Sequence, residues 1–224
     1  MTETPSATLP LDVNPKQYVL ELEPNFDDFT FTGSESIELD VVQSTDRIVL
    51  NSMEIEIQSG AVSANGSDQQ AREIAFDTDA ETVTFVFDSA LPAGPATLAI
   101  GFTGELNDKL RGFYRSNYQD LDGAEKFLAS TQFESTDARR AFPCWDEPSR
   151  KATFDVTLVV PSHLATISNT EEVSREERPD SKVAVRFAPT PVMSTYLVAF
   201  VVGDLACIED TAEGGTLIRV WATK

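Results

Sequence analysis

Hydrophobic and polar residues alternate along much of this chain with a period of two. Five segments show this alternation clearly: Gln17–Glu23, Ile37–Val41, Thr82–Phe87, Phe154–Val160 and Val183–Phe187. In the third of them, Val83, Phe85 and Phe87 share one face. Because successive side chains of a strand point to opposite sides, this pattern predicts half-buried antiparallel strands.

Turn-forming residues separate the alternating segments. They occur at Asn65–Gly66, Pro92–Pro95, Asn107–Asp108 and Gly214–Gly215. Glycine, proline and asparagine at such points are typical of short connections between strands. Many short strands with regular turns predict an all-β, sandwich-like fold of bent, packed sheets, antiparallel or mixed.

Three segments depart from the simple alternation. Tyr196–Val202 is apolar on both faces, which predicts a central strand covered on both sides. Glu171–Asp180 is highly charged and has no core face, so we expect an exposed hairpin loop. Helical signals are scarce: Ser135 or Thr136 is suited to cap a short turn through Asp137–Arg140.

Length and charge narrow the classes of function. The 224 residues suffice for one large domain, or for one domain with an appendage. The formal net charge of −20 argues against a nucleic-acid partner, because no basic stripe is present to meet phosphates. The acids are spread along the whole chain, which favours a role in solubility or salt adaptation over attraction of cationic peptides.

Nothing in the sequence indicates a membrane protein. The chain has no apolar run of about 18 residues, the length that a transmembrane helix needs. Met1–Pro5 lacks the basic and apolar regions that open a secretory signal. We therefore expect a cytoplasmic protein with no membrane partner.

The cysteines and the histidine offer little chemistry. Cys144 and Cys207 do not make a disulfide framework, and we expect both to be reduced thiols. Cys144 is predicted to be a packed thiol, because a nucleophile needs an activating partner and His163 has no evident link to it. One histidine cannot make the His-Glu-x-x-His site of a zinc peptidase. We expect no catalytic residue and no metal ligand in this chain, and an ordinary surface position for His163.

Ser130–Pro148 is the most informative stretch of the chain. It combines adjacent arginines with acids, prolines, a cysteine and a tryptophan, a mixture unsuited to a core strand or to a solvated linker. It therefore predicts a packed, irregular segment with fixed polar partners. Arg139–Arg140, followed by Asp146 and Glu147, predict an internal ion-pair network that fixes the loop. Trp145 is expected to anchor the segment in the core.

This stretch resembles the TQFE…DARRAFPCWDEP segment of the zinc-dependent aminopeptidases related to puromycin-sensitive aminopeptidase and aminopeptidase N. The resemblance continues through Lys151–Phe154 and Ser194–Phe200, and it is weak before residue 110. It implies an amino-terminal, saddle-shaped β domain over residues 1–204. Residues 205–224 would be the leading strand of a thermolysin-like catalytic domain, truncated before its catalytic motifs.

The resemblance also implies cofactors and partners. The complete enzyme would use zinc, and this chain would bind none. The implied partners are the missing catalytic domain and the amino terminus of a peptide substrate.

Two residues receive a substrate-binding role from the resemblance. The family's acid at the position of Glu134 reaches into the catalytic cleft and binds the free α-amino group of the peptide by a charge-assisted hydrogen bond. Gln132 lies two residues away on the same face of an extended segment and resembles the residue that lines the first side-chain pocket. The residues alone leave an alternative open, in which Glu134 pairs with Arg139 or Arg140.

These observations support one main hypothesis and two rivals. The first is the substrate-anchoring domain of a zinc-dependent aminopeptidase that removes amino-terminal residues from peptides, inactive by itself because the zinc ligands lie beyond Lys224. The second is a stand-alone β-sandwich module that binds peptide amino termini or docks another subunit. A purely structural sandwich is a weaker third, since it leaves Gln132 and Glu134 unexplained. The reading frame after Lys224 distinguishes the first two.

Overall fold

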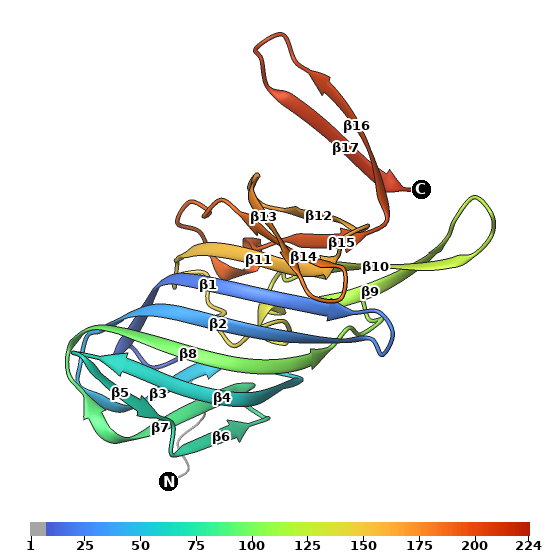
Figure 1. The fold of residues 1–224 in the computed structure, drawn as a ribbon. Coiled ribbons are helices and arrows are strands. Elements are labelled where there is room, and N and C mark those ends of the chain that lie inside the picture. Colours follow the sequence, from blue (N-terminus) through green and yellow to red (C-terminus); the bar gives the residue numbers. More distant parts are fainter. Residues whose placement is uncertain (1–7) are drawn as a thin grey trace.

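Strands account for nearly all the regular structure (Figure 1), which confirms the predicted all-β fold. The computed structural model describes residues 8–224, so the Met1–Pro5 start used in the localisation hypothesis lies outside the described residues. Each of the five alternating segments forms a strand. In β7, Val83, Phe85 and Phe87 are buried as predicted.

The largest sheet has eight strands and curves across the molecule (Figure 1). In spatial order it contains β13 (Glu172–Arg178), β14 (Lys182–Phe187), β11 (Thr153–Pro161), β1 (Val13–Asn25), β2 (Thr30–Val41), β8 (Gly94–Glu105), β4 (Ile55–Ala64) and β5 (Ser67–Gln70). The sheet is mixed, because β1 and β11 run parallel while the other neighbours run antiparallel.

Three smaller sheets complete the described part of the chain. One contains β12 (Ala165–Ser168), β15 (Phe200–Gly203), β10 (Glu125–Gln132) and β9 (Gly112–Gln119). Another contains β3 (Thr45–Asn51), β7 (Thr82–Leu91) and β6 (Glu73–Asp77). The hairpin of β16 (Leu205–Thr211) and β17 (Leu217–Thr223) stands away from the body in Figure 1. Helical structure in residues 8–224 is limited to the 3-10 turns η1 (Ala138–Arg140) and η2 (Thr195–Leu197), and no helix there is long and apolar enough to cross a membrane.

Aromatic rings join the large sheet to the smaller ones. Phe31 on β2 lies 5.3 Å from Phe113 on β9, measured between ring centroids, and Phe113 lies 4.9 Å from Phe200 on β15. Tyr18 on β1 stacks on Phe154 on β11 at 4.8 Å. All five rings are completely buried. The core therefore runs continuously between the sheets, as a sandwich requires.

The Tyr196–Val202 prediction is partly wrong. The segment begins in η2, and only its end belongs to β15, which does lie centrally between β12 and β10. Leu197 and Ala199 are exposed, while Val198 and Phe200 are buried. One face of this apolar segment is thus left uncovered by the described residues.

The expected hairpin loop at Glu171–Asp180 is wrong as well. Residues Glu172–Arg178 form the edge strand β13, which pairs with β14. Its side chains are exposed, as predicted, except that of Ser174, which is half-buried. The strand has no core face, and its backbone hydrogen bonds to β14 hold it in the sheet. Charged side chains on an edge strand also discourage pairing with other molecules.

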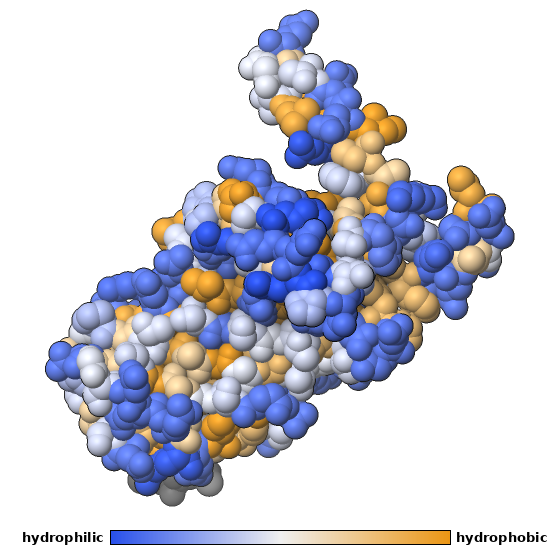
Figure 2. All heavy atoms as spheres, in the orientation of Figure 1, coloured by the Kyte–Doolittle hydropathy of each residue, from blue (hydrophilic) through white to orange (hydrophobic). Residues whose placement is uncertain are grey.

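Polar residues cover most of the visible surface in Figure 2, whereas paler, less polar residues gather over the strands of the large sheet.

Trp145 and Cys144 are buried, which confirms the predicted core anchor and packed thiol. Both Cys144 and Cys207 are free thiols, as expected. His163 is exposed.

Candidate functional site

Glu134 follows the end of β10 and is held there by its neighbour. Phe133 is buried, and its ring meets those of Phe142 and Phe200 edge-on at centroid distances of 6.0 and 6.1 Å. Gln132 and Glu134, on either side of it, are exposed. The Gln132 side-chain amide donates a hydrogen bond to the Glu134 carbonyl oxygen at 3.4 Å. The two predicted site residues therefore lie together at the surface, next to a rigid apolar anchor.

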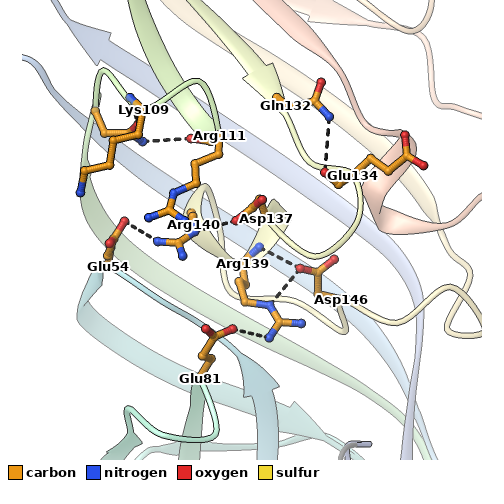
Figure 3. A network of polar contacts seen from close by, with 11 residues as sticks. Glu54, Glu81, Lys109, Arg111, Gln132, Glu134, Asp137, Arg139, Arg140 and Asp146 are labelled. Carbon is orange, nitrogen blue, oxygen red and sulfur yellow. Dashed lines mark hydrogen bonds and ion pairs between the residues drawn. The ribbon is translucent and has the colours of Figure 1, made fainter.

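The Glu134 carboxylate makes no ion pair with any residue in 8–224. Figure 3 shows it pointing away from Arg139 and Arg140. The alternative in which Glu134 pairs with one of these arginines is therefore wrong. Both guanidinium groups bind other carboxylates.

Arg139 is held by one acid near in sequence and one far away. Its backbone N–H and its Nε both donate to Asp146 Oδ2, at 3.3 and 3.0 Å. Its Nη1 donates to Glu81 Oε2 at 2.7 Å. The Asp146 side chain is almost completely buried. The Arg139–Asp146 pair is the more deeply buried part of the predicted ion-pair network.

Arg140 repeats the same arrangement with different partners (Figure 3). Its Nε donates to Asp137 Oδ1 at 2.7 Å, and its Nη1 lies 2.6 Å from Glu54 Oε2. Asp137 stands at the N-cap position of η1, but its carboxylate accepts the hydrogen bond from Arg140 and makes no hydrogen bond that caps the turn. The expected cap by Ser135 or Thr136 is wrong, although the short helical turn itself is present.

Glu147 takes a different partner from the one predicted. It forms an ion pair with Arg150 at 3.4 Å, and its Oε1 accepts a hydrogen bond from the Leu9 backbone N–H at 2.6 Å. It thus ties the end of the segment to the start of the described chain. The predicted network is confirmed for Arg139 and Asp146. Arg140 pairs with Asp137 and Glu54 in place of Asp146 or Glu147, and Glu147 pairs with Arg150.

Sequence reasoning missed Glu54 and Glu81. Glu54 lies between β3 and β4, and Glu81 lies between β6 and β7; both have a positive φ, 58° and 53°. Backbone hydrogen bonds run from Ser52 N–H to Glu81 O and from Met53 N–H to Arg139 O, both at 2.9 Å. Two loops far apart in the sequence therefore meet η1. No local pattern distinguishes these two acids from the many other surface acids of the chain.

The buried groups behind the segment are unsuited to nucleophilic chemistry. Burial raises the pKa of the Cys144 thiol well above its usual value. Burial likewise raises the pKa of Tyr18, whose hydroxyl oxygen accepts a hydrogen bond from the Trp145 backbone N–H at 3.1 Å. Both groups stay protonated near neutral pH and serve packing.

The described residues do not fit a metal site. No group of three or more histidine, cysteine, aspartate or glutamate side chains is placed to hold a metal ion in residues 8–224. His163 is exposed, and Cys144 is fully buried. A resident zinc ion has no donor set here.

Comparisons with known proteins find similar sequences along most of the chain. A family model described as the peptidase M1 N-terminal domain matches residues 14–197. "Aminopeptidase 2" of Candida albicans is 47% identical over 216 residues, which cover 96% of this chain and 23% of that protein. "Puromycin-sensitive aminopeptidase" of Caenorhabditis elegans is 43% identical over 215 residues, covering 95% and 23%. "Aminopeptidase M1-A" of Oryza sativa subsp. japonica is 44% identical over 220 residues, covering 96% and 25%. The chain spans about a quarter of the length of these curated relatives.

Proposed function

Because this chain belongs to the peptidase M1 N-terminal domain family, we propose that it is the substrate-anchoring part of a zinc-dependent aminopeptidase. The relatives that it resembles are named aminopeptidases. One observation carries the proposal. Glu134 presents an exposed carboxylate that has no ion pair with any residue in 8–224, although two arginines lie only a few residues further along the chain.

A free carboxylate suits the task of recognising a chain end. The amino terminus of a peptide differs from its interior by one positive charge. A carboxylate that is fixed and not already neutralised binds that ammonium group by a charge-assisted hydrogen bond. Peptides that lack a free amino group leave the carboxylate unpaired and bind less well. Gln132, exposed beside Glu134, would contact the first residue of the substrate.

The catalytic chemistry belongs to another part of the proposed enzyme. Zinc, when bound in a complete aminopeptidase, activates water and polarises the scissile carbonyl. The residues of this chain described above do not fit the ion. Their proposed contribution is to bind and orient the amino terminus of the peptide.

Residues 205–224 are proposed to lead into the catalytic domain, with residues 1–204 as the β domain. The β16–β17 hairpin supports this division, because it forms a sheet separate from the others. Ile208, Ile218 and Val220 lie on one face of the hairpin and are at least half exposed, with Ile208 paired directly to Val220. An open apolar face of this kind is typical of a surface that another part of a protein covers.

Replacing Glu134 by alanine in the full-length protein tests the proposal. A hydrogen bond to a charged group contributes about 1.5–3 kcal/mol. We therefore expect kcat/KM for an aminoacyl reporter to fall by about 10- to 150-fold. The midpoint of thermal unfolding should stay unchanged, since the exposed carboxylate binds no other described side chain. A lower melting temperature with unchanged kinetics per folded molecule would contradict the proposal.

A further inference from the structure

The two arginines next to Glu134 are each held by two carboxylates of different origin. Asp137 and Asp146 belong to the same segment as the arginines and fix its internal shape. Glu54 and Glu81 come from separate loops, one beside the large sheet and one in the three-stranded sheet. The first pair would survive a movement of the segment as a whole. Of these four carboxylates, only Glu54 and Glu81 connect the segment to other parts of the molecule, where they add to the backbone hydrogen bond from Met53 N–H to Arg139 O.

We propose that Glu54 and Glu81 are positioning residues for the Glu134 carboxylate. This inference rests on the proposed role of Glu134 in binding the substrate amino group. Glu81 reaches Arg139 at 2.7 Å and Glu54 reaches Arg140 at 2.6 Å. Both arginines belong to η1, which begins four residues after Glu134. A shift of η1 is therefore transmitted to Glu134 through a very short piece of chain.

The segment between Glu134 and η1 is tied at both ends. The Asp137 N–H donates to the Phe133 carbonyl oxygen at 2.9 Å, which closes a tight turn around Glu134. Phe133 is locked among buried rings on one side. Arg139 and Arg140 are locked by their carboxylates on the other side. The Glu134 side chain therefore projects from a backbone whose two ends are independently fixed.

The same contacts keep Glu134 available for a substrate. A guanidinium group left with one partner has free N–H donors, and a nearby exposed carboxylate would satisfy them. In the folded chain Glu81 accepts a hydrogen bond from Arg139 Nη1, and Glu54 forms an ion pair with Arg140 Nη1.

The partial burial of the arginines gives these contacts more effect than ordinary surface ion pairs have. The Arg139 and Arg140 side chains are 11% and 7% exposed, whereas Glu81 and Glu54 are 35% and 43% exposed. Exposed pairs contribute little to stability, because water and salt screen them. Removing one acid here instead leaves a largely buried guanidinium group with an unsatisfied side. We expect the segment around η1 to shift so that this guanidinium group regains a partner or contact with water.

The test is a double-mutant cycle in the full-length protein. Glu54→Gln and Glu81→Gln are made separately, in the native background and together with Glu134→Ala. KM and kcat are measured on an aminoacyl reporter with a free amino group. We expect each glutamine variant to raise KM by about threefold to tenfold with kcat nearly unchanged, and to have no further effect once Glu134 is absent.

Matched variants separate positioning from folding. Glu56→Gln removes the same charge from an exposed acid on β4 that has no ion pair with any residue described, and we expect unchanged kinetics. Glu54→Asp and Glu81→Asp keep the charge on a shorter side chain and should give intermediate KM values. They also provide folded proteins for the measurement if a glutamine variant fails to fold.

Three outcomes overturn the inference. Equal losses in the native and Glu134→Ala backgrounds would mean that Glu54 and Glu81 only support the fold. A large effect of Glu134→Ala with no effect of the glutamine variants would leave the proposed function standing and remove the positioning role. No effect of Glu134→Ala itself would remove both.

Discussion

A Cβ atom at Gly112 would lie 2.7 Å from the Cβ atom of Arg140. Real Cβ atoms do not approach so closely, so the first residue of β9 has room for a hydrogen atom only. Gly112 also has a φ of +68° and pairs with Gln132 across the sheet. One glycine therefore lets β9, β10 and η1 converge beside Glu134.

Replacing Gly112 by alanine should destabilise the protein. The left-handed backbone conformation costs about 1–3 kcal/mol for a residue with a side chain, and the contact with Arg140 adds to it. Chemical denaturation of the variant measures the sum. Gly66→Ala is the matched control, because Gly66 has a φ of +75° with no atom within 4 Å of its Cβ position. If both variants lose the same stability, the contact with Arg140 has no energetic effect.

The strand pattern was readable from the sequence where burial follows a period of two. Val83, Phe85 and Phe87 could be assigned to the core because each is large, apolar and spaced by two. Glu172–Arg178 could not be recognised as a strand, because an edge strand held by its backbone needs no apolar face. The exposure of Leu197 was equally hidden, since an apolar side chain does not reveal whether anything covers it.

Only part of the candidate site could be predicted from the sequence. Arg139 and Asp146 stand close together in the sequence, so their ion pair could be predicted. Glu54 and Glu81 reach the two arginines of η1 through tertiary folding alone. Their partners depend on the relative placement of three loops, which no spacing in the sequence encodes.

The buried carboxyl group of Glu35 should make the stability of the protein depend on pH in an unusual way. It lies in β2 between buried Leu20 and Ile100, and neither carboxylate oxygen has a hydrogen-bond partner among the described residues. Burial raises its pKa well above the usual range. Tyr18 and Cys144, which interact electrostatically with Glu35, have raised pKa values of their own and are protonated near neutral pH.

The sign follows from proton linkage. From about pH 4.3, where an exposed glutamate titrates, up to the raised pKa of Glu35, the folded protein binds more protons than the unfolded one. Its free energy of unfolding therefore falls as the pH rises through this window. We expect Glu35→Gln to remove this slope, and Glu35→Met to raise the free energy of unfolding at pH 7 by about 1–3 kcal/mol.

Denaturation at a series of pH values measures this effect, with Glu38→Gln, an exposed acid on the same strand, as the control. Burial raises the pKa of Asp146 too, even though Arg139 lowers it. Because Asp146 is present in every variant, the difference between the profiles isolates Glu35. Identical slopes with and without Glu35 would show that its carboxyl group is solvated in solution.

The open face of the β16–β17 hairpin should make this chain self-associate when it is prepared alone. At low salt the net charge of −20 keeps the molecules apart. At 1 M salt the Debye length shrinks to about 3 Å, so this repulsion is screened. We expect binding of an apolar dye at all salt concentrations and a rise in sedimenting mass at high salt.

Ile218→Thr together with Val220→Thr should weaken both signals, since these side chains are 50% and 61% exposed on the apolar face. Val173→Thr, at an exposed valine on β13, changes a similar side chain in a different sheet and should leave both signals as they were. A monomer that binds no dye at any salt concentration would mean that the hairpin folds back onto the body.

Glu134→Gln tests whether charge or shape recognises the substrate. The glutamine keeps the length of the side chain and one hydrogen-bond acceptor, but it loses the charge that strengthens a bond to an ammonium group. We expect its kcat/KM for a free amino terminus to lie between those of the native protein and Glu134→Ala. The native preference for free over acetylated amino termini should shrink in both variants, because neither holds an unpaired carboxylate against an acetylated peptide.

Competition between free and acetylated peptides, followed by mass spectrometry, gives this ratio directly. Glu171→Gln and Glu176→Gln, at exposed acids near the β13 edge, each remove one negative charge, as Glu134→Gln does, and control for long-range attraction. If they reduce the preference as much as Glu134→Gln does, the selectivity comes from the overall negative field. If only the Glu134 variants reduce it, the selectivity comes from one carboxylate that the arginine network leaves unpaired.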